Sequence, residues 1–221
     1  MAPFNAHDIR VVGFDLDQTL YPKSPLVDEK IQEYLYEKIA SHKKIPLDEA
    51  KQLFGERYRD GAGLSGSETL RDLGVPNASE AVQEALERAD IASILSPDPD
   101  TNRLLEDVRT HYKNLDLITG SNLRETEKKL SALGIPKEMF SHLITAEQAA
   151  KSTGESYRIW LSLYPEYAPR QFLYIGDRIR SDGEIPSALG IHTALVCAQK
   201  PGTSLPTMQL HNLAELASIL L

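Results

Sequence analysis

The sequence predicts an α/β fold, with a parallel sheet flanked by helices and a small all-helical domain inserted after the first strand. From about residue 102 onward, short apolar segments alternate with helical segments, a pattern typical of a parallel sheet with right-handed crossovers. Between residues 26 and 90, apolar residues recur at helical spacing and no strong strand signal occurs. We therefore expect residues 1–21 and 97–221 to form the core and residues 22–96 to form the helical domain.

The first strand is predicted at residues 11–14, a short apolar run that suits a strand buried on both faces. Asp15 and Asp17 follow this strand directly. In open α/β sheets, ligands bind beyond the carboxyl ends of the strands. Two carboxylates separated by one residue at that place therefore indicate a chemical site, although a solvated acidic turn is the alternative for the pair considered alone.

The inserted segment contains three expected helices. Leu26, Ile31, Leu35 and Ile39 recur at helical spacing in the first, Pro46 precedes the second at 47–60, and Ser79 precedes the third at 80–90 as an expected N-cap. The glycine-rich segment 61–76 is expected to break the helical pattern, and Ser96–Asp100 to mark the return to the core. Three tyrosines are expected to pack in this domain: Tyr34, Tyr36 and Tyr58.

The remaining elements of the core alternate along the chain. Strands are expected at 115–118, 142–146, 172–178 and 193–197, and helices at 102–112, 124–134, 156–164 and 210–221. Cys197 is the single cysteine, which excludes an intrachain disulfide and a thiolate zinc cluster. At the end of the last expected strand, it is interpreted as a small buried apolar residue.

The composition is that of a water-soluble globular chain with a formal net charge of -8. Its scattered lysines and arginines give no basic footprint for a nucleic-acid polymer, while one local positive site suffices for a small phosphorylated ligand. Residues 1–10 lack the apolar core of a signal peptide, and no apolar run approaches the ~20 residues of a membrane span. We expect a cytoplasmic protein without a membrane partner.

Polar groups follow the predicted strands in a fixed order. They are Asp15 and Asp17, then the turn of Thr119, Gly120, Ser121 and Asn122, then Lys151 in a loop, then Asp177 and Asp182. With these groups, the sequence resembles the haloacid dehalogenase-like (HAD) hydrolase superfamily over essentially its whole length. Its DxDxT motif is matched by Asp15, Asp17 and Thr19, and its fourth motif by Gly176, Asp177 and Asp182. The resemblance implies a Rossmann-like core and a helical cap.

Phosphate-ester hydrolysis gives these residues physical roles. Phosphate monoesters hydrolyse extremely slowly unaided, so an enzyme must supply a nucleophile, neutralise charge and protonate the leaving oxygen. Asp15 is expected to attack phosphorus and form an aspartyl-phosphate. Asp17 is expected to protonate the leaving group and then to activate water, which requires surroundings that raise its pKa.

The expected phosphate and metal ligands complete the site. Asp15 and Asp177, with Asp182 as a third candidate carboxylate, require a hard divalent cation, and Mg²⁺ fits best. The resemblance adds the backbone carbonyl of Asp17 as a ligand. Thr119 and the N–H groups of Gly120 and Ser121 would hold phosphoryl oxygens near a helix N-terminus, although such a turn is often only a helix cap. Lys151 would supply positive charge.

Lys151 departs from the family pattern, which commonly places Pro after this lysine where Ser152 stands here. Lys200, followed by Pro201, is the competing lysine, but it comes after the fourth motif. Arg178 is interpreted as a structural ion-pair partner and not as a catalyst.

Two segments resemble the pyrimidine 5'-nucleotidase-like branch of the superfamily. They are DLDQTLYP, where Gln18 replaces the usual Asn, and the degenerate segment 61–76. This resemblance implies a nucleoside 5'-monophosphate as substrate; a sugar phosphate or phosphoglycolate is the alternative within the superfamily. The cap would select the substrate, with Tyr21, Arg59 and Ser65 as candidate contacts.

Other functional classes are weighed against this hydrolase. A receiver-type signalling domain or a non-catalytic phosphate-binding protein would share several of the same groups, but Asp17 favours turnover. Dehalogenases of the superfamily lack the second aspartate. A dinucleotide-binding oxidoreductase is disfavoured because no GxGxxG follows the first strand.

Overall fold

A computed structural model describes residues 4–22, 24–59, 63–196 and 207–221 of the chain. The chain divides into an α/β unit, Met1–Pro22 with Leu95–Leu221, and a helical unit, Lys23–Ile94. These borders lie within two residues of the expected ones after residues 21 and 96. None of the helices in the described ranges is long and apolar enough to cross a membrane.

The α/β unit is built on a six-stranded parallel sheet with the order β3-β2-β1-β4-β5-β6. The strands are β1 (Val11–Phe14), β2 (Asn114–Ile118), β3 (His142–Ile144), β4 (Phe172–Gly176), β5 (His192–Val196) and β6 (Thr207–Leu210). The predicted parallel α/β sheet is therefore confirmed. The first strand of the chain lies in the middle of the sheet, between β2 and β4.

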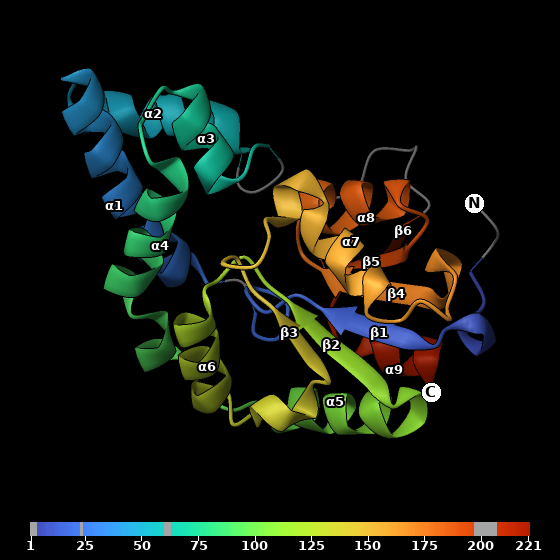
Figure 1. Cartoon of the computed structure of the whole chain (residues 1–221). Coiled ribbons are helices and arrows are strands. Elements are labelled where there is room, and N and C mark those ends of the chain that lie inside the picture. The colour runs from blue at the N-terminus through green and yellow to red at the C-terminus, as the bar shows by residue number, and fades with distance from the viewer. Residues whose placement is uncertain (1–3, 23, 60–62, 197–206) are drawn as a thin grey trace. The chain divides into compact units, whose positions relative to one another are not determined.

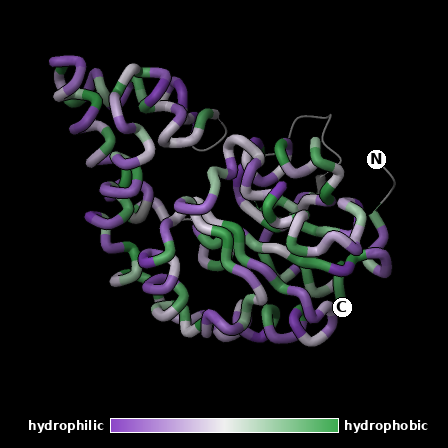
Figure 2. The backbone as a smooth tube through the Cα atoms, in the orientation of Figure 1, coloured by the Kyte–Doolittle hydropathy of each residue, from purple (hydrophilic) through white to green (hydrophobic). Residues whose placement is uncertain are grey.

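Helices cover both faces of this sheet (Figure 1). Helices α5 (Pro99–Tyr112) and α9 (Glu215–Leu220) lie on one face, and α7 (Glu155–Ser162) and α8 (Ile185–Ala188) lie on the other. Coverage on both sides explains why the strands are almost continuously apolar, as the green tube of the sheet in Figure 2 shows. The Cα register of β1 and β4 pairs Val11 with Phe172 and Phe14 with Ile175.

Gly13 allows α7 to lie close to the sheet. Trp160 on α7 is fully buried, and a Cβ atom built at Gly13 would lie 2.6 Å from its ring. A larger residue in the middle of β1 would therefore push the indole away. Trp160 also packs edge to face on Phe172 and Tyr174 of β4, and these rings form the core of this face.

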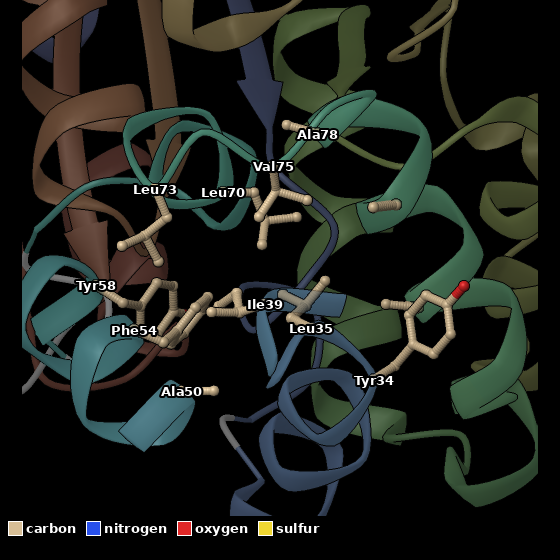
Figure 3. Close-up of a cluster of buried hydrophobic side chains, with 12 residues drawn as sticks. Tyr34, Leu35, Ile39, Ala50, Phe54, Tyr58, Leu70, Leu73, Val75 and Ala78 are labelled. Atoms are coloured by element: carbon tan, nitrogen blue, oxygen red, sulfur yellow. The ribbon is translucent and has the colours of Figure 1, made fainter. Parts of the chain in front are cut away.

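The helical unit contains α1 (Pro25–Lys43), α2 (Leu47–Tyr58), α3 (Gly66–Asp72) and α4 (Ala78–Ala89), followed by a 3₁₀ turn at Ile91–Ile94. No strand occurs in its described residues, so the predicted helical insertion is confirmed there. Its core consists of buried apolar side chains from all four helices (Figure 3). Tyr34 and Tyr58 are buried in this core and Tyr36 packs against it, as expected.

Two details of the helical unit correct the sequence prediction. Helix α3 lies inside the glycine-rich segment that was expected to break the helical pattern, because Ser65 and Glu68 form a capping box that starts a helix there. Helix α4 begins at Ala78 after Asn77, so the predicted N-cap at Ser79 is wrong and Ser79 lies within the first turn.

The C-terminal part of the α/β unit also differs. The strand β6 was not expected, and α9 is shorter than the helix predicted at 210–221, since Leu210 ends β6. A four-residue strand that contains Gln209 gives too short an apolar run to be recognised. Cys197 and Lys200, about which the sequence made predictions, lie outside the described residues.

Candidate active site

The site lies where the strand order reverses. Strands β2 and β3 extend the sheet from one side of β1, and β4, β5 and β6 extend it from the other. The crevice beyond the carboxyl ends of β1 and β4 is therefore a topological switch point. Asp15 follows β1, and its N–H donates to the carbonyl of Ile175 in β4 at 2.8 Å. Asp177 follows β4 directly, so the two carboxylates come from neighbouring strand ends.

Three carboxylates converge at this point. One oxygen from each of Asp15, Asp177 and Asp182 lies within 4.8 Å of the other two. Burial, opposed by Lys151 and reinforced by Asp182 and Asp17, raises the pKa of Asp15 to about 6. Burial likewise raises the pKa of Asp177 to about 8, with Arg178 opposing and Asp182 adding to the shift.

This cluster fits a hard divalent cation. Asp177 Oδ1 is buried and has no hydrogen-bond partner within the described parts of the chain, which is costly for a carboxylate oxygen unless something binds it. All three residues offer oxygen, the ligand type that Mg²⁺ prefers. The cluster contains two of the expected metal residues, Asp15 and Asp177, together with Asp182; the side chain of Asp17 does not belong to it.

The backbone around Gly176 brings Asp182 into the cluster. Ile179–Glu184 forms a π-helical turn, a geometry often found at functional sites. A Cβ atom at Gly176 would lie 2.5 Å from Cβ of Asp182, so only glycine permits this approach. Asp182 Oδ2 accepts from the N–H of Arg178 at 3.0 Å, and Tyr157 donates its hydroxyl to Oδ1 at 3.3 Å. Asp182 is thus fixed from two elements.

Lys151 is the cation of this cluster. It stands in a 3₁₀ turn, Lys151–Thr153, before α7, and its Nζ lies 2.5 Å from Asp15 Oδ1 and 2.8 Å from Asp182 Oδ1. Tyr174 accepts a third hydrogen bond from it at 3.1 Å. Burial opposes its charge, but Asp15 and Asp182 outweigh burial and hold the pKa of Lys151 well above its ordinary value. The structure therefore brings Lys151 and Asp15 together, as the sequence predicted.

Asp17 lies in a second polar group beside the first. Its Oδ1 accepts from Lys129 Nζ at 2.5 Å and from the Tyr21 hydroxyl at 2.7 Å, and its Oδ2 accepts from the Ser121 hydroxyl at 2.8 Å. Burial would raise its pKa, but the charge and hydrogen bond of Lys129, with those of Tyr21 and Ser121, lower the pKa to about 2. The expectation that the surroundings of Asp17 raise its pKa is wrong, because the ammonium of Lys129, which the sequence did not reveal as a neighbour, stabilises the ionised carboxylate.

The turn after β2 is arranged around Thr119 and Ser121. Thr119 is buried, and its Oγ1 accepts from the N–H of Ser121 at 3.1 Å. The Ser121 carbonyl accepts from the N–H of Ala146 at 3.0 Å. The Ser121 hydroxyl donates to Asp17, so this side chain is engaged within the protein. The phosphate contacts expected of Thr119 and of the Gly120 and Ser121 N–H groups stay predictions. Asn122 then caps α6 (Leu123–Ala132), accepting at its side chain from Glu125 N–H, which satisfies the helix-cap interpretation of this turn.

Lys129 is the site residue that sequence reasoning missed. It lies in the charged run RETEKK, where nothing local distinguishes it from Lys128. The signal was its position: Thr126, Lys129 and Leu130 share the buried face of α6 at i, i+3 and i+4 spacing. A lysine on the buried face of a helix needs a buried partner, but only the fold identifies that partner as Asp17.

The three candidate substrate contacts have local roles in the structure. Tyr21 is buried and donates to Asp17. Ser65 accepts from the N–H of Glu68 and begins α3. Arg59 ends α2 in the left-handed region at φ 48°, and its Nε donates to the Glu56 carbonyl at 3.3 Å.

The sequence profile of the haloacid dehalogenase-like hydrolases matches residues 12–196. The chain belongs to this family. As a haloacid dehalogenase-like hydrolase, it carries the family's ordered strand-end groups on the expected fold, and the resemblance stated from the motifs is confirmed. No curated protein matches it significantly in sequence.

Solved structures share the fold of this haloacid dehalogenase-like hydrolase at low sequence identity. A HAD phosphatase from Thermococcus onnurineus is 20% identical with a TM-score of 0.62, covering 96% of this chain and 98% of its own. CbbY from Rhodobacter sphaeroides, solved in complex with phosphate, is 17% identical with a TM-score of 0.67, covering 96% and 100%. A 2-haloacid dehalogenase from Pseudomonas syringae pv. Tomato is 20% identical with a TM-score of 0.59, covering 96% and 98%. The fold therefore accommodates both chemistries, and the site residues must decide between them.

Proposed function

We propose that this hydrolase is a Mg²⁺-dependent phosphomonoesterase that acts through an aspartyl-phosphate. The observation that supports it most is the convergence of Asp15, Lys151 and the Asp177–Asp182 pair at the switch point, with Asp17 beside them. A nucleophile, a cation and a set of oxygen ligands within one small site meet the needs of phosphoryl transfer.

Each residue has a role in two successive displacements. Asp15 attacks phosphorus and the ester oxygen leaves, so that the phosphoryl group is carried on the Asp15 carboxylate. Water then releases phosphate and restores Asp15. Asp17 acts as the acid/base group: it gives a proton to the leaving ester oxygen in the first displacement, and in its ionised form it accepts the proton of the attacking water in the second. Thr119, Gly120 and Lys151 hold the phosphoryl oxygens, and Ser121 supports Asp17.

Asp15, Asp177, Asp182 and the backbone carbonyl of Asp17 would hold Mg²⁺. The cation would neutralise charge on the phosphoryl oxygens and offset the repulsion between the carboxylates. Until it binds, the raised pKa values of Asp15 and Asp177 reflect that repulsion and their burial.

We propose a nucleoside 5'-monophosphate as the substrate, on the resemblance of DLDQTLYP and segment 61–76 to the nucleotidase-like branch. The helical unit would serve as the cap that excludes water and selects the substrate. A sugar phosphate or phosphoglycolate is the alternative. Dehalogenation is disfavoured by Asp17, since an acid/base carboxylate serves an ester leaving group and is superfluous for a halide.

The test is phosphate release from pyrimidine and purine nucleoside monophosphates, a sugar phosphate, phosphoglycolate and p-nitrophenyl phosphate, with Mg²⁺ or chelator, alongside halide release from 2-chloropropionate. We expect phosphate release that chelation abolishes, and incorporation of labelled phosphate into acid-quenched protein. Asp15→Asn should abolish both signals. Asp107→Asn, an exposed change on α5, is the matched control and should leave both intact.

The outcomes separate the parts of the proposal. Halide release without phosphate release would replace the phosphatase by a dehalogenase. Activity that survives chelation would remove the metal. Preference for the sugar phosphate or phosphoglycolate would remove the nucleotide substrate while retaining the phosphatase.

A further inference from the structure

Lys129 is a buried cation that the proposed reaction does not itself require. Its side chain is 0% exposed, whereas that of its neighbour Lys128 is 41% exposed and pairs with Glu125. Burying an ammonium carries a large desolvation cost, and an apolar side chain at such a position is often equally stable or more so. Leu130, the next residue, is an apolar side chain buried on the same helix. A role in folding alone therefore does not account for this lysine.

The contacts of Lys129 form a closed ring with two other side chains. Its Nζ lies 2.5 Å from Asp17 Oδ1 and 2.9 Å from Ser121 Oγ, and Ser121 Oγ lies 2.8 Å from Asp17 Oδ2. Each oxygen of the Asp17 carboxylate thus receives a donor from this ring, so rotation of the carboxylate about its Cβ–Cγ bond would break hydrogen bonds on both sides. Charge-assisted bonds of this length are strong and directional.

We propose that Lys129 is a positioning residue, which together with Ser121 fixes the orientation of the Asp17 carboxylate next to Asp15 for phosphoryl transfer. The inference rests on the proposed phosphatase function. It adds to that function a specific support on α6, an element far from the nucleophile in the sequence. Lys129 acts through Asp17 and touches no reacting atom.

A double-mutant cycle tests this role. The substrate is p-nitrophenyl phosphate, whose leaving group needs little protonation, so that Asp17→Asn keeps a measurable rate. Lys129→Met in the wild-type background should lower kcat about 10- to 100-fold, the range for misplacing a catalytic group, with KM unchanged. In the Asp17→Asn background, the same change should alter kcat by less than about twofold, because the group that Lys129 positions is already lost.

Matched variants distinguish positioning from general damage. Lys128→Met removes the neighbouring exposed lysine and should leave kcat unchanged. Lys129→Arg keeps the charge and should restore part of the rate. Ser121→Ala, a smaller change on the same carboxylate, should show the same dependence on Asp17, and it carries the test if circular dichroism shows that Lys129→Met does not fold.

Three outcomes would overturn the inference. An unchanged kcat in Lys129→Met removes the role. An equal loss in the wild-type and Asp17→Asn backgrounds makes Lys129 structural only. Wild-type protein that releases no phosphate from any ester removes the proposed function and this inference with it, whereas active wild-type protein with additive losses removes the inference alone.

Discussion

At the scale of single residues, Asp116 is the clearest case of a buried carboxylate held in place by hydrogen bonds from its neighbours. It lies in β2 and is fully buried, yet four groups surround its carboxylate. The N–H of His142 donates at 2.9 Å, Trp160 Nε1 at 2.8 Å and the Tyr164 hydroxyl at 3.1 Å, and His142 Nδ1 lies 3.0 Å away. Burial raises its pKa, and these hydrogen bonds oppose the rise. Asp116 thus joins β2, β3 and the α7 region.

Asp116→Ala is expected to destabilise the fold by about 3–5 kcal/mol, because it leaves several buried donors without an acceptor. Asp116→Asn, which keeps one acceptor oxygen, should cost less. Urea unfolding followed by Trp160 fluorescence measures both, and Asp107→Ala on the exposed face of α5 should stay within about 0.5 kcal/mol of wild type. Equal losses in the Ala and Asn variants would show that the hydrogen bonds do not matter.

At the scale of elements, the glycines differ sharply in what they permit. At Gly13, an added Cβ would meet the Trp160 ring between β1 and α7, whereas at Gly55, within α2, it would meet nothing within 4 Å. The same substitution therefore has opposite expected effects in a strand and in a helix.

We expect Gly13→Ala to destabilise the protein by about 1–3 kcal/mol through overpacking. Gly55→Ala should stabilise it by about 0.5–1 kcal/mol, since alanine restricts the unfolded chain and favours the helix. Thermal unfolding of the two variants side by side checks the pair. A stabilising Gly13→Ala would mean that α7 moves freely away from β1.

The elements also show what the sequence could and could not predict. Strands β1 and β4 were predicted because an apolar run followed by an aspartate is a local signal, and the pairing of Lys151 with Asp15 followed from motif order. Helix α3 was missed because the glycines outweighed the capping box of Ser65. Lys129 was missed because its role depends on a partner that lies far away in the sequence. A local sequence pattern gives no information about such a contact.

At the scale of the whole molecule, the acidic cluster makes the stability of the fold depend on pH and on bound Mg²⁺. The folded state raises the pKa of Asp15 and of Asp177 from the ordinary value of 3.8 to about 6 and about 8. Each group contributes its full stabilisation at pH values below its pKa in the unfolded chain. This contribution is lost as pH rises through its pKa in the folded protein. Without metal, the protein should therefore be less stable at pH 8 than at pH 5.

Mg²⁺ should reverse this loss, because it binds the deprotonated carboxylates. At a hundredfold excess over Kd, the expected gain is about 2.7 kcal/mol, or about 5–10 °C in Tm at pH 8, and less at pH 5. Calorimetry with Mg²⁺ or chelator at both pH values measures it. Asp177→Asn should reduce both the pH slope and the gain, while identical Tm values with and without Mg²⁺ at pH 8 would exclude binding at this cluster.

The central position of β1 has a consequence for how the chain acquires its structure. Val11–Phe14 must pair with β2 and β4, yet the whole helical unit, Lys23–Ile94, separates it from both. During synthesis, β1 leaves the ribosome first and the helical unit follows it. The helical unit can then form through local contacts, while β1 still has no partner strand for its apolar side chains. The sheet closes only after β4 emerges, so the site that Asp15 and Asp177 share is assembled late, and truncated chains lack it.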